Sequence, residues 1–202
     1  MRSFLLMTWI KPRPAAGRAA RGWTRRAGCE IIRGMIAARW IRLGRVEPLE
    51  LRAAYTGLAA AQSSGAAPIL LWGSTAMRCA FALVTPRKFA PGRASRWSAW
   101  ALAPAVAACR RLGVPAYLEG GEIWLHGRSV ARSQVAAIGE CAVAVSGFPA
   151  RLAPDGALEE GLRLRLEAQH GWQFDHSWPD RAEAASIARA REALSEPVLK
   201  VA

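Results

Sequence analysis

Basic side chains that could bind an anionic group stand in two parts of the chain. The first is the segment 86–97, a predicted loop rich in proline, glycine and arginine. The second is the segment 126–132, in which a His-Gly pair precedes two arginines. Guanidinium and ammonium groups bind carboxylate and phosphate oxygens, so both segments are candidate anion-binding regions. The candidate residues are Arg87, Lys88, Arg93, Arg96, Arg128 and Arg132.

The composition offers a second interpretation of these side chains. The chain has 25 arginines among its 28 basic residues and uses alanine heavily, so surface arginines are expected throughout.

Three tryptophans near the basic segments also have two interpretations. Trp97, Trp100 and Trp124 would line an apolar ligand pocket or would be ordinary core and rim residues.

Length and composition indicate one folded domain. The 202 residues are 52% hydrophobic and 21% charged, which excludes global disorder. No apolar run reaches the 18 residues of a membrane-spanning helix, so a membrane partner is not expected. The formal net charge is +13, of which residues 1–34 carry +7 and residues 35–202 carry +6.

Residues 1–34 are therefore interpreted as a basic, disordered arm, and residues 35–202 as a single domain. Translation starting at Met35 is a further interpretation of this boundary. A transit peptide, a nucleic-acid-binding arm and a secretory signal are the alternatives for the arm.

The cysteines and histidines show no metal-ligand spacing. The four cysteines are widely separated, without a C-x-x-C pair, and Cys109 and Cys141 lie in apolar runs. We expect those two to be buried, no metal to be bound, and the protein to be cytoplasmic.

Hydrophobic periodicity predicts an α+β fold with a mixed, mostly antiparallel sheet packed with helices. Turn signals at Gly120-Gly121, His126-Gly127 and Gly139 separate consecutive short strands. The predicted elements are a strand at 36–43, a helix from Pro48 to about 62, strands at 69–72 and 79–84, a helix from about Ala103 to 112, strands at 115–118, 122–126, 129–136 and 140–147, and helices at 156–169 and from Ser177–Pro179 to 194.

The second helix is predicted to start late because proline is tolerated only in the first helical turn. Pro104 would lie in that turn. Its buried stripe would consist of Leu102, Ala105, Val106, Cys109 and Leu112.

Four stretches of the chain resemble, in their sequence and in their order, parts of the catalytic domain of the lipoate/biotin protein ligase and octanoyltransferase family. The longest, at 118–131, reads LEGGEIWLHGRSVA and is similar to the family's Asn-Asp pair, strand and Asp-Gly-Lys-Lys turn. The resemblance covers about residues 38–195. The other stretches lie at 40–43 and 48–59, and at the C-terminal end of the domain at Gly171 with 178–183.

The resemblance also implies a ligand site and shows where this chain departs from it. Gly121-Glu122 occupies the Asn-Asp position, and Gly127 opens the turn. The family lysine, the cation that stabilises developing charge, falls on Ser129, and a family glycine falls near Arg132. The family's Arg-Arg-x-x-Gly-Gly-Gly loop would follow Val84, where 86–97 stands instead.

Gly121, Gly127, the two arginines of the hairpin and the basic loop are thus the implied ligand-binding residues. Arg128 or Arg132, or the basic loop, would have to replace the missing lysine. By strict alternation Arg128 points to the face opposite Ser129.

Three functions remain open. The chain would be a divergent ligase or acyltransferase that attaches lipoyl, octanoyl or biotinyl groups to a lysine of a carrier protein, degenerate at the catalytic lysine. It would otherwise be a non-catalytic, ligase-like domain that binds a partner, or a basic nucleic-acid-binding protein, which no known nucleic-acid-binding motif supports. ATP and lipoate, octanoate or biotin are implied only if the family activity survives, with a lipoyl or biotinyl carrier domain as partner.

Deleting residues 1–34 is expected to leave the melting temperature within a few degrees of that of the full chain. The segment has no apolar periodicity that would pack on a core. Thermal unfolding followed by circular dichroism on the two proteins checks this. A large loss of stability in the shortened protein would show that the segment belongs to the folded structure.

Overall fold

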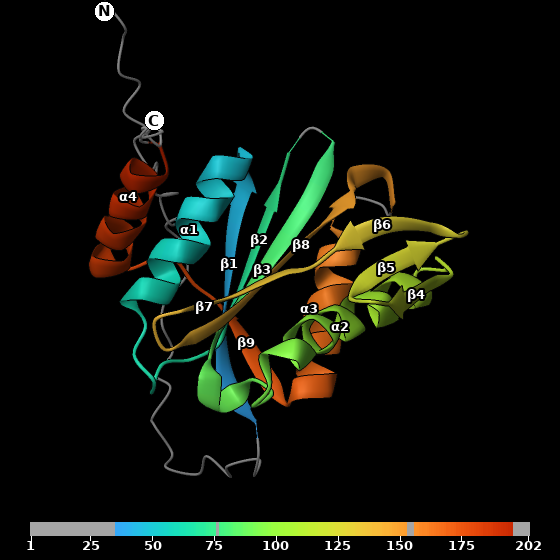
Figure 1. Cartoon of the computed structure of the whole chain (residues 1–202), viewed down its shortest axis with the longest axis horizontal. Helices are drawn as coiled ribbons and strands as arrows, with labels where there is room; N and C mark the ends of the chain where they lie inside the picture. The colour runs from blue at the N-terminus through green and yellow to red at the C-terminus, as the bar shows by residue number, and fades with distance from the viewer. Residues whose placement is uncertain (1–34, 76, 153–155, 196–202) are drawn as a thin grey trace, which may run out of the picture. The chain divides into compact units, whose positions relative to one another are not determined.

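A six-stranded sheet and a three-stranded sheet form the framework of the computed structural model, which describes residues 35–75, 77–152 and 156–195 (Figure 1). The arm expected at 1–34 lies outside these residues. The large sheet has the order β7-β8-β3-β2-β1-β9 and the small one β4-β5-β6. The strands are β1 (Ile36–Arg45), β2 (Ile69–Ser74), β3 (Arg78–Pro86), β4 (Ala116–Glu119), β5 (Glu122–Leu125), β6 (Arg128–Arg132), β7 (Gln134–Ile138), β8 (Cys141–Pro149) and β9 (Trp172–His176).

The pairing pattern confirms the predicted fold class. Strand β1 runs parallel to both β2 and β9, and every other described pair is antiparallel. The sheet is therefore mixed and mostly antiparallel, as expected for an α+β fold.

Helices cover both faces of the large sheet (Figure 1). One core cluster joins α1 to the sheet, and α4 packs on the outside of α1. The other cluster joins α2, α3 and the small sheet to the opposite face. The helices are α1 (Pro48–Ala61), α2 (Trp97–Arg111), α3 (Ala157–His170) and α4 (Arg181–Ser195). None of the helices in the described part of the chain is long and apolar enough to span a membrane.

Helix α1 begins where the sequence predicts. Pro48 occupies the first turn, and Glu47 and Glu50 form a capping box in which each side chain accepts a backbone N–H of the other residue. Further along, α4 crosses α1 at Gly57, where a Cβ would lie 2.4 Å from the Cα of Ile187. The close contact between these helices therefore requires glycine at this position.

Helix α2 corrects the prediction of a late start. It begins at Trp97, and Pro104 lies inside it, fully within the buried face. The proline removes one backbone hydrogen bond, but the apolar stripe continues on both sides of it, through Ala101 and Ala105. Leu112 was expected in this stripe, yet it follows the last helical residue and is 37% exposed.

Three other elements differ from the sequence prediction. The strand expected at 129–136 is two strands, because the chain leaves the small sheet after β6 and enters the large one as β7. Strand β9 was not predicted, since its pairing partner β1 is more than a hundred residues away. The last helix begins at Arg181 rather than at Ser177–Pro179.

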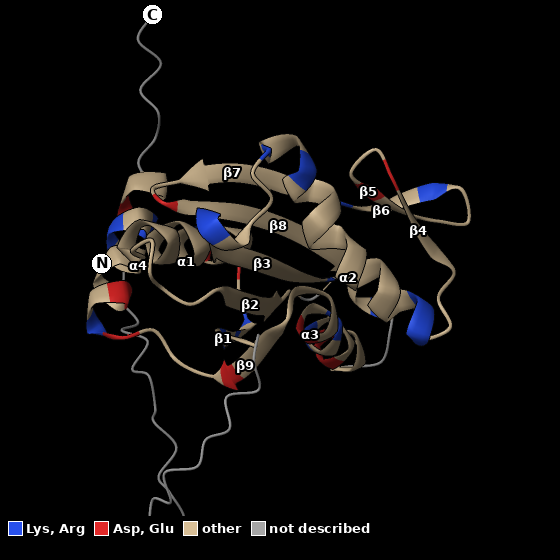
Figure 2. Ribbon diagram, turned by 90° about the horizontal axis from the view of Figure 1, so that it is seen from below, with Lys and Arg blue, Asp and Glu red and all other residues tan. Residues whose placement is uncertain are grey.

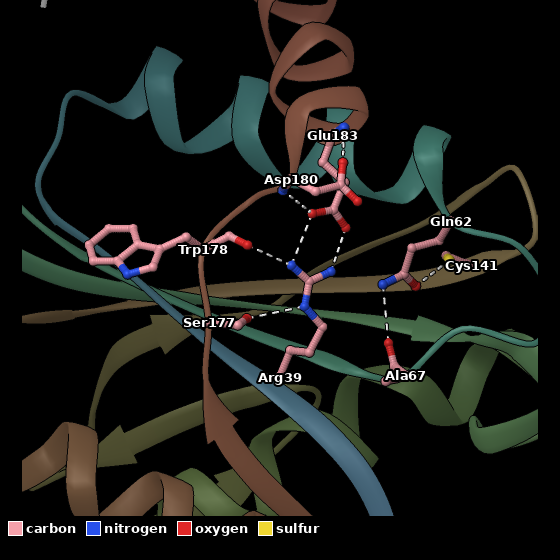
Figure 3. A network of polar contacts seen from close by, with 8 residues as sticks. All are labelled: Arg39, Gln62, Ala67, Cys141, Ser177, Trp178, Asp180 and Glu183. Carbon is pink, nitrogen blue, oxygen red and sulfur yellow. Dashed lines mark hydrogen bonds and ion pairs between the residues drawn. The ribbon is translucent and has the colours of Figure 1, made fainter. Parts of the chain in front are cut away.

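A network around Arg39 of β1 fixes the chain between β9 and α4 (Figure 3). Its guanidinium donates to both carboxylate oxygens of Glu183, at 2.9 Å for Nη2–Oε2, and to the carbonyl of Trp178. Its Nε donates to the hydroxyl of Ser177 at 3.1 Å. Hydrogen bonding to Glu183 raises the pKa of Arg39, so this cation stays charged.

The two cysteines predicted to be buried are buried. Cys109 and Cys141 are completely inaccessible, and desolvation raises the pKa of each thiol to about 11. The thiol of Cys141 also contacts Oε1 of Gln62 at 3.4 Å (Figure 3). Both thiols are therefore protonated at neutral pH.

Leu102→Asp is expected to unfold or aggregate the protein, because Leu102 is 0% exposed and burying an unpaired carboxylate costs several kcal/mol. Leu112→Asp is the matched control, since the same change there places the carboxylate in solvent. Urea denaturation measures both. Equal tolerance of the two substitutions would contradict the assignment of the buried helix face.

The stability is expected to fall as the pH falls below about 6.5. Burial lowers the pKa of His170 from its ordinary value of 6.5, and its ring stacks on Trp100 with centroids 4.6 Å apart. The unfolded chain therefore takes up this proton at a higher pH than the folded chain, and protonation favours unfolding. His170→Phe keeps a stacked ring and should reduce the loss of stability between pH 7.5 and 5.5.

His126→Asn is the control for this substitution, because His126 is exposed in a turn at φ +49°, a conformation that asparagine tolerates. Chemical denaturation at several pH values gives the free energy of unfolding of each variant. An unchanged pH dependence in His170→Phe would show that other groups cause it.

Candidate functional site

A cleft of about 350 Å³ lies on the α1 face of the large sheet. The start of α1 and the preceding loop form one wall, and the β2–β3 hairpin and the β6–β7 connection form the others. Its lining residues are Val46, Glu47, Pro48, Leu51, Gly73, Ser74, Thr75, Arg78, Ala80, Arg132, Gln134, Val145, Ser146 and Gly147.

Small residues form the floor of this cleft. Gly73 of β2 pairs with Ala80 of β3, which pairs with Gly147 of β8, so the three lie in one row across the sheet. At Gly73 a Cβ would lie 2.7 Å from Cγ2 of Val46, and at Gly147 it would lie 3.3 Å from the carbonyl oxygen of Cys79. Larger side chains in this row would fill the space that the cleft occupies.

Arg78 and Arg132 are the cations of the cleft. Nη2 of Arg78 donates to the carbonyl oxygen of Gly147 at 2.7 Å, and none of the ion pairs between described residues includes Arg78. Arg132 instead pairs with Glu122, with 2.6 Å between Nε and Oε1. Arg78 is therefore the cleft cation whose charge no described carboxylate neutralises.

A β-bulge brings Glu122, Ser129 and Arg132 to one face of the small sheet. Ile123 pairs with Ala131 but Trp124 pairs with Ser129, so one residue of β6 has no partner. Strict alternation would have placed Ser129 and Arg132 on opposite faces. Hydrogen bonding from Ser129, and then from Arg132, lowers the pKa of Glu122, so its carboxylate is ionised at neutral pH.

The other predicted residues of the hairpin lie outside the cleft lining. Gly121 has φ +78°, and a Cβ there would meet the hydroxyl of Ser98 at 2.8 Å, so turn geometry and close packing account for this glycine. Gly127, at φ +72°, lies in the turn at the other end of β5 and β6, and the exposed Arg128 is the first residue of β6.

The four residues of the basic loop do not line the cleft either. Arg87 and Lys88 follow the end of β3 opposite to Arg78, roughly 30 Å along the strand. There Arg87 donates to the carbonyl of Gly139 at 3.0 Å. Arg93 and Arg96 are exposed in the loop before α2.

The three tryptophans considered for an apolar pocket also have other surroundings. Trp97 is buried, and its Nε1 donates to the carbonyl of Pro91 at 2.7 Å. Trp100 of α2 packs against the rings of His170 and Trp172, and Trp124 stacks on Tyr117. The larger aliphatic side chains that line the cleft are instead Val46, Leu51 and Val145.

Lysine, the residue that the resemblance leads us to look for, is absent from the cleft lining. Lys88 is the only lysine in the described ranges, and its Nζ lies 4.6 Å from the ring centroid of Phe89. Ser129, where the family lysine would fall, faces Glu122 instead.

Sequence reasoning found Arg132 but missed Arg78, Gly73 and Gly147. The signal for the glycines was present, since each interrupts an apolar strand without a turn. Arg78 could not be distinguished from other arginines without the register that places it beside Gly147.

Comparisons with known proteins give fold similarity alone. No protein-family model and no curated protein matches the sequence. Among solved structures, a Thermoplasma acidophilum protein named as a candidate lipoate protein ligase, with bound lipoic acid, has 10% identity and a TM-score of 0.66 over 78% of this chain and 96% of that one.

Two further structures show the same fold. A bipartite lipoate protein ligase from the same organism, determined in a study of that ligase and its E2 lipoyl domain, has 8% identity and a TM-score of 0.67, covering 78% of this chain and 92% of that one. A biotin acetyl coenzyme A carboxylase synthetase from Helicobacter pylori, with bound biotinylated ATP, has 12% identity and a TM-score of 0.51, with coverage of 65% and 74%. The chain has the fold of lipoate and biotin protein ligases.

Proposed function

We propose that this ligase-like domain binds a small carboxylic acid with an apolar tail in the cleft, but does not convert it to an acyl-adenylate. Lipoate, octanoate and biotin are acids of this kind. A lipoyl or biotinyl carrier domain is the partner that the proposal implies, because a neighbour with this fold was studied with its E2 lipoyl domain.

The lining of the cleft supports acid binding. Its volume of about 350 Å³ is within the range of small-molecule sites, and Val46, Leu51 and Val145 give it apolar walls. Arg78 lines this space with a charge that no described carboxylate neutralises, and a guanidinium binds a carboxylate through two parallel hydrogen bonds. Glu47 is the one acid in the lining, and the capping box already uses its carboxylate.

The proposed loss of adenylation rests on one observation, the pairing of Glu122 with Ser129 and Arg132. Activation of an acid by ATP builds negative charge on the acyl phosphate and requires a cation positioned beside it. Ser129 brings no charge, and the charge of Arg132 is balanced by Glu122. The basic loop does not supply the missing charge, because it does not line the cleft.

Acyl-adenylate formation from ATP with lipoate, octanoate or biotin is expected to run at least about a hundredfold below the rate of an active ligase. Removal of a single preorganised oxyanion donor costs about 2.7–4 kcal/mol, and a lost full charge should cost no less. Pyrophosphate release measures this step, with an active lipoate ligase as the positive control.

Ser129→Lys alone is expected not to restore adenylation, since the new ammonium would pair with the carboxylate of Glu122. Pyrophosphate release at the rate of an active ligase from the unmodified protein would refute the proposed loss. Alanine substitutions at Arg78, Arg128 and Arg132 would then identify the cation in use.

Acid binding is tested separately by calorimetry with octanoate and lipoate. Arg78→Ala is expected to weaken binding about tenfold, as for the loss of a charge-assisted hydrogen bond. Arg189→Ala removes an exposed arginine of α4 and should leave the affinity unchanged. Absence of binding to the unmodified protein would contradict this part of the proposal and leave the adenylation result standing.

A further inference from the structure

A second and larger hollow, here called the α2–α3 groove, is lined by residues of α2, β4 and α3. These elements lie on the side of the large sheet opposite to α1 (Figure 1). The groove has a volume of about 720 Å³, and it shares no lining residue with the cleft. The groove is lined by Ala103, Val106, Ala107, Arg110, Arg111, Tyr117, Leu118, Arg165 and Gln169.

Three arginines and no acid line the α2–α3 groove. Arg110 and Arg111 come from the last turn of α2, where Figure 2 shows basic residues, and Arg165 comes from α3. None of the three takes part in an ion pair between described residues. By contrast, Arg163 of the same helix is paired with both Glu160 and Glu167.

This arrangement favours an anion with several oxygens. Three like charges around one groove repel one another, and a bound anion removes that repulsion. Nε of Arg110 donates to the carbonyl oxygen of Ala116 at 2.7 Å, which fixes the guanidinium and leaves its terminal nitrogens for a ligand. Phosphate groups match such a set of guanidinium donors.

The remaining lining favours a planar ring next to the charged groups. Tyr117 is 38% exposed in the groove, and its ring is backed by Trp124, with an interplanar angle of 18°. Aromatic side chains held in this way stack on nucleobases, and the short side chains of Ala103 and Ala107 leave room along α2.

We infer that the α2–α3 groove binds a mononucleotide, with its phosphates on Arg110, Arg111 and Arg165 and its base against Tyr117. The volume is within the range of small-molecule sites. This site is separate from the acid-binding cleft and goes beyond the proposed function.

Calorimetry with ADP and with inorganic pyrophosphate on the full chain tests the inference. ADP is expected to bind, and Arg110→Ala and Arg165→Ala are each expected to weaken it at least fivefold. Tyr117→Leu should weaken ADP binding at least threefold and leave pyrophosphate binding unchanged, because only ADP has a base. Arg52→Ala, which removes an exposed arginine of α1, is the charge-matched control.

Three results would overturn the inference. The first is ADP affinity that none of the groove substitutions changes, and the second is affinity that Arg78→Ala abolishes, which would place the nucleotide in the cleft. The third is an affinity for a twelve-nucleotide oligouridylate that is at least tenfold higher than the affinity for ADP. That result would indicate a site for single-stranded nucleic acid. Circular dichroism confirms that each variant is folded. Octanoate binding depends on the cleft, so its failure would not change these results.

Discussion

The bidentate pair between Arg39 and Glu183 joins parts of the chain that are 144 residues apart in sequence. Arg39 lies in β1, the strand with parallel neighbours on both sides, and Glu183 lies in the first turn of α4. The pair fixes α4 over α1, whose own first turn forms a wall of the cleft. Glu183 is buried, so removal of Arg39 would leave a desolvated carboxylate without its counter-charge.

The small sheet contributes to both candidate sites. Arg132, at the end of β6, lines the cleft, and Tyr117 and Leu118 of β4 line the α2–α3 groove. Ile123, Ala116 and Ala131 anchor the sheet in the core through its inner face. Because these buried residues hold the sheet in place, its outer face carries charged and aromatic residues without loss of packing.

Elements marked by local chemistry were predictable from the sequence. Pro48 and the apolar periodicity located α1, and the glycines at 127 and 139 located two hairpins. Strand β9 was not predicted, because long-range pairing with β1 stabilises it. The first two turns of α2 were not predicted, because burial of Trp97 and Ala101 stabilises them. Trp172 and Phe174 do alternate with exposed residues, but five residues between two helices are a weak signal.

The candidate site was harder to predict than the fold, because it depends on register. Arg78 and Gly147 lie far apart in the sequence and become neighbours only through the pairing of β3 with β8. The loop at 86–97 has more basic residues than the cleft, yet it does not line the cleft. A count of charges in the sequence therefore does not locate the binding surface.

The bulge in β6 decides which side chains of this strand share a face. Ser129 and Arg132 are three residues apart, yet both lie on the face of Glu122, because one residue between them has no partner. In a regular strand with the same residues, Glu122 would pair with Ala131, and Arg132 would turn to the opposite face. During divergence, a change that removed the bulge but kept every residue of β6 would therefore separate the charges of Glu122 and Arg132 at the rim of the cleft.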